Sequence, residues 1–321
     1  MKYRYRVLAP ALIALAASFP AFADTFPNKP IKLIVPVPPG GTSDFMARQL
    51  ADQMSKSIGQ AVIVENRPGA NQTIAGLAVM RAPADGYTLL LGSFAMVVNP
   101  FMVSTVPYRY TDFDSVSLMA YTPNVLLAGP SAGAANVKDI LAQAKASPGK
   151  VTYASTSPGG SPHLSGALFN SMAKVDTVHV PFNGASPAMT ALLGGHVNLM
   201  FDNLPTALAQ IRGGKVKALA VTTKNRVPVI ADVPTLDESG LKGYEVNAWF
   251  GVFAPKGTPP QVVNLIATEV RKAVNQPDLR EKFHGLGAVG VGSTPMEFAS
   301  TLKSETAKWE AVIKEAGIKV E

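Results

Sequence analysis

Short apolar runs rich in β-branched residues alternate along this chain with segments of helical periodicity. Ile31–Val35 is such a run, and Ala47, Leu50, Ala51 and Met54 then recur at the spacing of one helix face. Strands that alternate with helices form mostly parallel sheets flanked by helices. The predicted fold class is therefore α/β.

The same periodicities assign most of the remaining chain. Predicted strands cover residues 61–65, 87–91, 116–119, 125–128, 151–155, 178–181, 197–202, 218–222 and 244–253. Predicted helices cover residues 74–80, 137–146, 163–172, 188–193, 207–211, 261–274, 277–283 and 296–316. Residues 98–110 contain prolines and aromatic residues and are predicted to be irregular. The α/β pattern occurs twice, with a predicted crossing between the two units near residues 121–123 and a return along 244–253.

The first 23 residues have the organisation of a secretory signal peptide. Lys2, Arg4 and Arg6 precede an apolar stretch, and small residues flank Phe22 before Asp24. We expect cleavage after Ala23 and export of the mature chain. No later run approaches the roughly 20 apolar residues that a membrane helix needs.

Composition excludes several classes of site. The chain has no cysteine, so thiol nucleophiles and Cys-based metal sites are absent and the fold must depend on its own core. The net charge is +7, and three basic residues of the signal peptide account for part of it. There are no basic runs, no Gly-x-Gly-x-x-Gly after a strand, no Gly-Lys-Ser/Thr and no metal-binding His-Glu-x-x-His. We expect no metal, no cofactor and no nucleic-acid partner.

Glycine- and hydroxyl-rich loops follow strands in both units. In the first unit the strand Ile31–Val35 leads into Pro39-Gly40-Gly41-Thr42-Ser43-Asp44, where Thr42 or Ser43 is the expected N-cap and Asp44 lies in the first helical turn. In the second unit the candidates are Ser155, Thr156, Ser157, Gly159 and Ser161, with Phe182, Asn183 and Gly184 in a later turn. Ser93 and Asp202 end further strands. Backbone N–H groups at a helix start bind carboxylates and phosphates, so these loops predict a ligand cleft between two sheets.

Catalytic residues are sparse in these loops. His163 is the one histidine near them, and the favoured interpretation is a helix-start residue hydrogen-bonded to the loop; His179 is expected to be structural, and His196 and His284 exposed. Around the candidate Ser161, Gly160-Ser161-Pro162 places a proline where the helix should continue from a nucleophile, so these residues do not form a nucleophile elbow. The sequence favours a noncatalytic binder, and a secreted hydrolase that uses Ser161 and His163 stays as an alternative.

Several motifs in order along the chain resemble one known family. They are Pro27-Asn28-Lys29-Pro30 before the first strand, Pro39-Gly40-Gly41-Thr42-Ser43-Asp44, Asn66-Arg67-Pro68-Gly69-Ala70, Asp85-Gly86-Tyr87-Thr88, Val180-Pro181-Phe182-Asn183-Gly184 and Trp249-Phe250-Gly251. This set resembles the Bug-type (TctC-like) periplasmic solute-binding receptors of tripartite tricarboxylate transporters.

The resemblance implies a two-lobed type II periplasmic binding protein, or Venus flytrap. Lobe 1 would comprise residues 24–123 and 250–321, and lobe 2 residues 124–249. A ligand carboxylate would be held by residues 39–44 and by the facing loops 156–161 and 182–184, with Ser93, Ser155, His163 and Asp202 nearby. The implied role is capture of a small carboxylate and delivery to membrane permease subunits, by a protein expected to be a monomer. A sensor that signals to a membrane receptor stays open as an alternative.

Departures from the family pattern bear on the ligand. Gln72 and Ala75 stand where glycines are expected, and Phe182-Asn183 replaces Tyr-Lys. The loss of a lysine argues against a citrate-like ligand, and Phe94 with Phe182 would form an apolar wall for an aromatic or alkyl acid. Asp202 is interpreted first as a cap of the helix after Asn203. A dicarboxylate, an amino acid and an aromatic acid all remain open as ligands.

Overall fold

The computed structural model describes residues 26–103 and 106–318. The predicted signal peptide, residues 1–23, lies outside the described residues. None of the described helices has the length and apolar character needed to cross a membrane.

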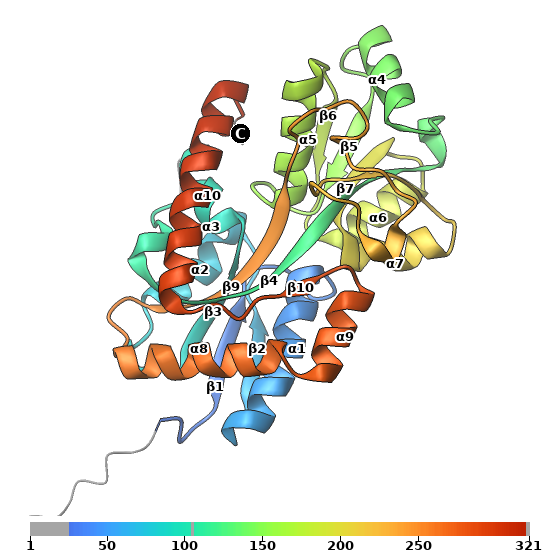
Figure 1. Ribbon diagram of the computed structural model, residues 1–321. Coiled ribbons are helices and arrows are strands. Elements are labelled where there is room, and N and C mark those ends of the chain that lie inside the picture. The colour runs from blue at the N-terminus through green and yellow to red at the C-terminus, as the bar shows by residue number, and fades with distance from the viewer. Residues whose placement is uncertain (1–25, 104–105, 319–321) are drawn as a thin grey trace, which may run out of the picture.

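Two groups of strands form the two lobes seen in Figure 1. The lobe 1 strands are β1 (Ile31–Val35), β2 (Val62–Asn66), β3 (Thr88–Ser93), β9 (Asn247–Pro255) and β10 (Val289–Gly290). The lobe 2 strands are β5 (Thr152–Ser155), β6 (Val178–Pro181), β7 (Leu199–Asn203) and β8 (Lys217–Val221). Parallel pairs join β1 to β2 and β3, and β5 to β6 and β7. The predicted α/β class is confirmed. Antiparallel pairs also occur, where β9 joins β3 at the centre of the sheet.

Helices flank both sheets. Those of lobe 1 are α1 (Thr42–Ile58), α2 (Thr73–Met80), α3 (Ala95–Met102), α8 (Pro260–Val274), α9 (Pro277–Gly285) and α10 (Pro295–Ala316). Those of lobe 2 are α4 (Val137–Ala146), α5 (Ser161–Ala173), α6 (Ala185–Leu193) and α7 (Leu204–Arg212). Short 3-10 turns are η1 (Ala70–Gln72), η2 (Tyr110–Asp112), η3 (Pro130–Ala132) and η4 (Pro228–Ile230).

One strand, β4 (Phe113–Ala128), belongs to both lobes. Its first part pairs with β9 as far as Pro123, opposite Asn247, and its second part pairs with β7 from Asn124, opposite Asn203. The sequence predicted two short strands here, and this was wrong, because the apolar pattern breaks at Tyr121-Thr122-Pro123 while the backbone stays extended. β4 changes its pairing partner from β9 to β7 between Pro123 and Asn124, next to the crossing between units that the sequence predicted near residues 121–123. The lobe boundaries, 24–123 with 250–321 and 124–249, stay a prediction.

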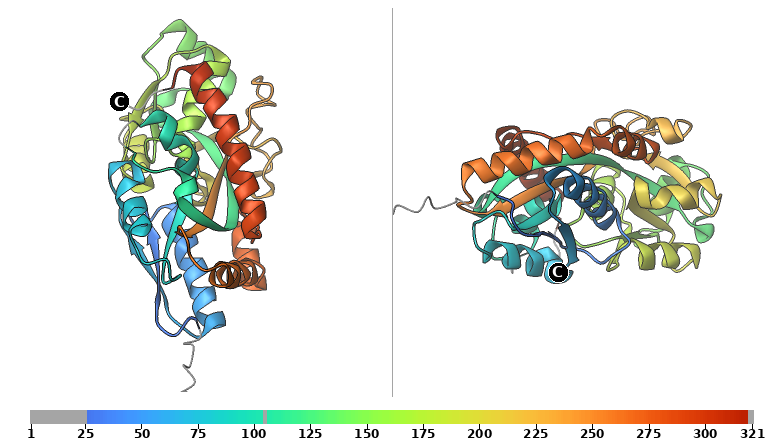
Figure 2. Two further views of the ribbon diagram at one scale, coloured as in Figure 1. Left: turned by 90° about the vertical axis from the view of Figure 1, so that its left-hand side faces the viewer. Right: turned by 90° about the horizontal axis from the view of Figure 1, so that it is seen from below.

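The C-terminal helix α10 lies along both lobes (Figure 2). Trp309 is 1% exposed and packs edge to face on Phe94 of lobe 1, while the C-terminal part of α10 contacts α5 of lobe 2. Trp309 and Ile313 belong to one apolar cluster that also holds Phe169 and Phe201 of lobe 2. The lobes therefore share a core on this side.

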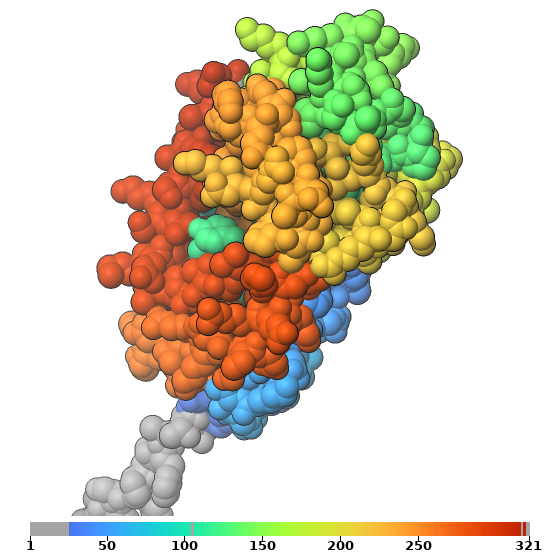
Figure 3. Space-filling view, turned by 45° about the vertical axis from the view of Figure 1, so that its right-hand side comes forward, coloured from blue at the N-terminus to red at the C-terminus, as the bar shows by residue number. Residues whose placement is uncertain are grey.

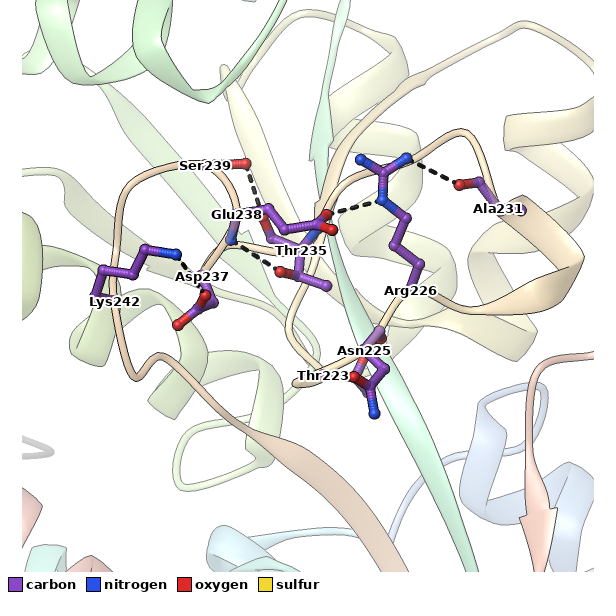
Figure 4. A network of polar contacts seen from close by, with 9 residues as sticks. All are labelled: Thr223, Asn225, Arg226, Ala231, Thr235, Asp237, Glu238, Ser239 and Lys242. Atoms are coloured by element: carbon purple, nitrogen blue, oxygen red, sulfur yellow. Dashed lines mark hydrogen bonds and ion pairs between the residues drawn. The ribbon is translucent and has the colours of Figure 1, made fainter.

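A long loop between β8 and β9 is fixed by the polar network of Figure 4. Glu238 accepts from Arg226 Nε at 2.8 Å and from the Thr235 backbone N–H at 2.9 Å, and Lys242 pairs with Asp237 at 2.9 Å. Val227 of this loop lies against the Gly287 turn of lobe 1. In Figure 3 this orange loop meets the red-orange C-terminal segments, so it links the lobes on a second side.

Two further predictions of local structure were wrong. Residues 95–102 form α3, although the irregular segment was predicted from residue 98, because the apolar burial of Val97 and Val98 stabilises the helix despite Pro100. The N-cap of α1 is Gly41, and neither Thr42 nor Ser43 provides a side-chain cap.

Candidate functional site

A cavity of about 50 Å³ lies between the lobes. It is bounded by the loops at the carboxyl ends of β1, β3, β5, β6 and β7, the edge at which α/β sheets bind ligands. Predicted site residues that line it are Gly41, Thr42, Ser43, Ser93, Thr156, Ser157, Ser161, Gly184 and Asp202. Gly160 of the predicted loop 156–161 and Phe94 of the predicted apolar wall line it too. The remaining lining residues were not predicted, namely Val37, Pro38, Gln72, Pro162, Ala185, Asn203, Ala248, Trp249 and Phe250.

Four helices begin at this cavity. α1 starts in lobe 1 after Gly41, and α5, α6 and α7 start in lobe 2 after Gly160, Gly184 and Asn203. No N-cap side chain of these four helices bonds a backbone N–H group of the first turn, so the N–H groups there lack the usual partner. Pro162 of α5, Pro187 of α6 and Pro205 of α7 have no N–H, so these three helices offer fewer donors than α1. Each helix also presents the positive end of its dipole. The arrangement is suited to an anion held by backbone groups from both lobes.

The lining as described contains one ionisable side chain, Asp202, and no Lys, Arg or His. Asp202 is 1% exposed; its Oδ1 accepts from the Asn203 N–H at 2.8 Å and its Oδ2 from the Thr206 hydroxyl at 2.9 Å. The pKa of Asp202 is raised to about 7, because the effect of burial is larger than the opposing effect of the two hydrogen bonds. The N-cap of α7 is Asn203, and no side chain caps this helix, so the predicted cap role of Asp202 was wrong.

A hydroxyl contact closes the cleft beside Asp202. Thr42 Oγ1 of lobe 1 lies 3.4 Å from Thr206 Oγ1 of lobe 2. This contact separates the inner cavity from an outer hollow of about 500 Å³, which Gly40 lines. Thr42 and Asp202 line both spaces.

Three predicted residues of the first loop lie outside the inner cavity. Pro39 and Gly40 are exposed. Asp44 is buried, and its carboxylate accepts from the Gly40 N–H, Asn66 and Arg48 at 3.0–3.1 Å. Burial raises the pKa of Asp44, but these hydrogen bonds hold it below its usual value. Asp44 therefore positions the loop.

In lobe 2, Ser155 and His163 pack behind the cavity wall. His163 Nδ1 accepts from the Gly159 N–H at 3.2 Å, as the favoured interpretation predicts. The ring stacks on His179 with centroids 4.1 Å apart, and His179 Nε2 lies 2.7 Å from Ser155 Oγ. Burial lowers the pKa of His163 to about 3, with a further contribution from His179, and burial lowers that of His179 to about 4. Both rings are neutral at physiological pH.

Phe182 and Asn183 also lie outside the inner cavity. Phe182 packs on the apolar core of lobe 2, and Asn183 is exposed at an outer hollow. Of the predicted apolar wall, Phe94 lines the cavity and Phe182 does not. Trp249 and Phe250 of β9 complete that wall, and the Trp-Phe-Gly motif was the sequence signal for them.

Ser161 belongs to a buried amide and hydroxyl network. Its Oγ donates to Asn124 Oδ1 at 3.2 Å, and Asn203 Nδ2 donates to the same oxygen at 2.6 Å. The hydroxyl does not bond His163, whose Nδ1 is occupied by Gly159. The pair lacks the nucleophile–base hydrogen bond that a hydrolase uses.

We expect Ser161→Ala to cost about 1 kcal/mol of unfolding free energy, because one buried hydrogen bond is lost while Asn124 Oδ1 keeps a donor. Urea denaturation measures this. Ester hydrolysis should stay at the buffer rate in Ser161→Ala, His163→Asn and the unmodified protein alike. A turnover in the unmodified protein that either substitution removes would contradict the structural role.

Comparison with known proteins gives consistent matches over the whole fold. The family described as "Tripartite tricarboxylate transporter family receptor" matches residues 46–318. The chain is 36% identical over 304 residues to protein BugT of Bordetella pertussis, covering 94% of this chain and 93% of that protein. It is similar to the solved structure of Rpa4515 of R. palustris with adipate, at 35% identity and TM-score 0.88, covering 92% of this chain and 99% of that one. It is also similar to MatC from Rhodopseudomonas palustris with bound malate, at 34% identity and TM-score 0.85, covering 90% and 100%.

Proposed function

The chain belongs to the tripartite tricarboxylate transporter receptor family, and we propose that it is an exported receptor that closes on a small dicarboxylate and delivers it to the membrane permease of such a transporter. The predicted resemblance to Bug-type receptors and the two-lobed binding-protein fold are confirmed. The family binds solutes and is not enzymatic, so the noncatalytic interpretation is confirmed as well.

The convergence of four helix N-termini on one cavity is the observation that carries the proposal. A carboxylate placed there receives N–H groups from α1 on one side and from α5, α6 and α7 on the other. Because both lobes supply donors, the anion binds the closed arrangement more tightly than an open one. This difference in affinity is what drives closure.

A dicarboxylate is favoured among the ligands that the sequence left open. Similar structures hold adipate and malate. The absence of Lys and Arg from the described lining disfavours a citrate-like trianion. The proposal includes cleavage of the signal peptide after Ala23, export of the mature chain and a membrane permease as its partner.

We expect small dicarboxylates to raise the thermal midpoint of the purified protein. A ligand at a hundred times its dissociation constant adds about 2.7 kcal/mol to the unfolding free energy. Differential scanning fluorimetry with malate, succinate, adipate, citrate and benzoate measures the shift. The protein is first unfolded and refolded to remove any retained ligand.

The matching amides of these acids serve as the control, since they keep the size and lose the anion. Equal shifts by acids and amides would contradict recognition at the helix N-termini. If no carboxylate raises the midpoint of the refolded protein, the proposed function is wrong.

A further inference from the structure

Three consecutive residues other than glycine adopt left-handed backbone conformations beside the cavity. Ala70, Asn71 and Gln72 have φ values of 46°, 50° and 72°. L-residues rarely adopt this region, and a run of three stores conformational strain. Such strain persists only where the surroundings hold it in place and is concentrated at functional sites.

The surroundings of this segment do hold it. Asn99 Nδ2 of α3 donates to the Asn71 carbonyl at 2.7 Å, and the Tyr108 hydroxyl donates to the Gln72 carbonyl at 3.2 Å. Both donors are buried, at 3% and 4% exposure. Gln72 is also the N-cap of α2, where its left-handed backbone sets the direction of that helix. The fold therefore fixes where the Gln72 side chain points.

Gln72 is one of six residues that lie between two spaces; the others are Val37, Pro38, Thr156, Ser157 and Gly184. Gln72 is 7% exposed and lines both the inner cavity of about 50 Å³ and a neighbouring hollow of about 440 Å³. Ala70 and Asn71 line the hollow alone. Gln72 is therefore the one member of the strained run that forms a wall of the inner cavity.

The amide of Gln72 has an unused donor on that wall. Its Oε1 accepts from the Ser93 hydroxyl at 3.3 Å, and its Nε2 has no hydrogen-bond partner among residues 26–103 and 106–318. The described lining supplies no cationic side chain, so a side-chain N–H here is a scarce donor for an anionic group. Hydrogen bonds to ionised groups are stronger than those between neutral groups.

We propose that Gln72 is a specificity-determining residue of this receptor, which donates to the second carboxylate of the bound acid and limits its length to that of short dicarboxylates. The first carboxylate occupies the helix N-termini, and Gln72 meets the other end before it reaches the hollow. This inference rests on the proposed function.

The test compares Gln72→Gly with Asn71→Gly across the series succinate, glutarate, adipate and pimelate, with dissociation constants from calorimetry. Both substitutions relieve a left-handed residue, so the thermal midpoints should be unchanged or raised. Gln72→Gly joins the cavity to the hollow, so affinity for succinate should fall about tenfold or more while that for pimelate is kept or gained. Asn71→Gly should keep the order of the unmodified protein.

Gln72→Glu tests the donor separately from the wall. The side chain keeps its size but presents a carboxylate to the second carboxylate of the ligand. Succinate affinity should fall about tenfold or more, and butyrate, which has one carboxylate, should lose less.

The outcomes separate the two proposals. If the unmodified protein binds none of the acids, the proposed function fails. If it binds them and Gln72→Gly keeps the same order of affinities, or if Gln72→Glu affects succinate and butyrate equally, the role of Gln72 is overturned and the proposed function stands.

Discussion

Replacing Gly159 with alanine is expected to lower the affinity for the carboxylate ligand about a hundredfold and to leave the protein folded. Gly159 precedes α5 in lobe 2 with φ at 71°, and a Cβ built on it clashes with Asn99 Oδ1 of lobe 1. Overpacking of this kind typically costs about 1–3 kcal/mol, and the upper part of that range corresponds to the expected fall in affinity.

The clash exists only while the two lobes touch. In an open arrangement the Gly159 loop is free of Asn99, so the added methyl group acts on closure more than on folding. The left-handed φ adds a cost of about 1–2 kcal/mol in both arrangements. Gly133 of lobe 2 provides the matched control, because its φ is 58° and, apart from its chain neighbours, no atom in the described part of the chain lies within 4 Å of an added Cβ.

Calorimetric titration and urea denaturation separate the two effects. Gly133→Ala and Gly159→Ala should lose similar unfolding free energy without ligand, and Gly159→Ala alone should lose affinity. Equal affinities of the two glycine variants would show that this contact does not limit closure.

Acidification from pH 6.5 to 4.5 is expected to remove about 2 kcal/mol of unfolding free energy for each of His163 and His179. The folded-state pKa values, about 3 and about 4, lie below the unfolded value near 6.5. The unfolded chain therefore binds protons that the folded protein excludes. This stability is complete above pH 6.5 and is lost as the pH falls toward the folded values.

Asp202 acts in the opposite direction. Burial raises the pKa of Asp202 to about 7, so its contribution to the unfolding free energy is complete below the unfolded pKa and is lost as the pH rises through 7.

Substitution of each histidine isolates the part of the unfolding free energy that this histidine contributes. His163→Asn and His179→Gln should each flatten the acid limb of the stability profile, and His196→Gln, on an exposed turn, should not. Urea denaturation at a series of pH values measures the profiles. Imidazole NMR signals of His163 or His179 that titrate near pH 6.5 would contradict the prediction.

The order of strands and helices could be predicted from local sequence. A strand such as Ile31–Val35 and the apolar stripe of α1 each report burial within a few residues, and tertiary contacts did not override them. The glycine- and hydroxyl-rich loops could be placed at the carboxyl ends of strands by the same logic. That placement puts Gly41, Ser93, Thr156 and Gly184 together at one cavity.

The roles of individual side chains could not be read in this way. Asp44, His163 and Phe182 belong to the predicted loops, but they point into the fold behind the cavity, because rotamer and helix phase are decided by the packing of neighbouring elements. Trp249 reaches the cavity because β9 pairs with β3 and β4. No local pattern specifies that pairing.

By itself, then, the sequence determined the α/β class, the two units and the loops that carry the site, since these depend on patterns within a few residues. Only the tertiary structure decided that β4 runs through both sheets, that four uncapped helix starts converge and that Gln72 forms a wall in a left-handed conformation. These features depend on contacts between residues that are far apart in the sequence. Asn99 and Tyr108, for example, bond the strained turn across about 30 positions of the chain.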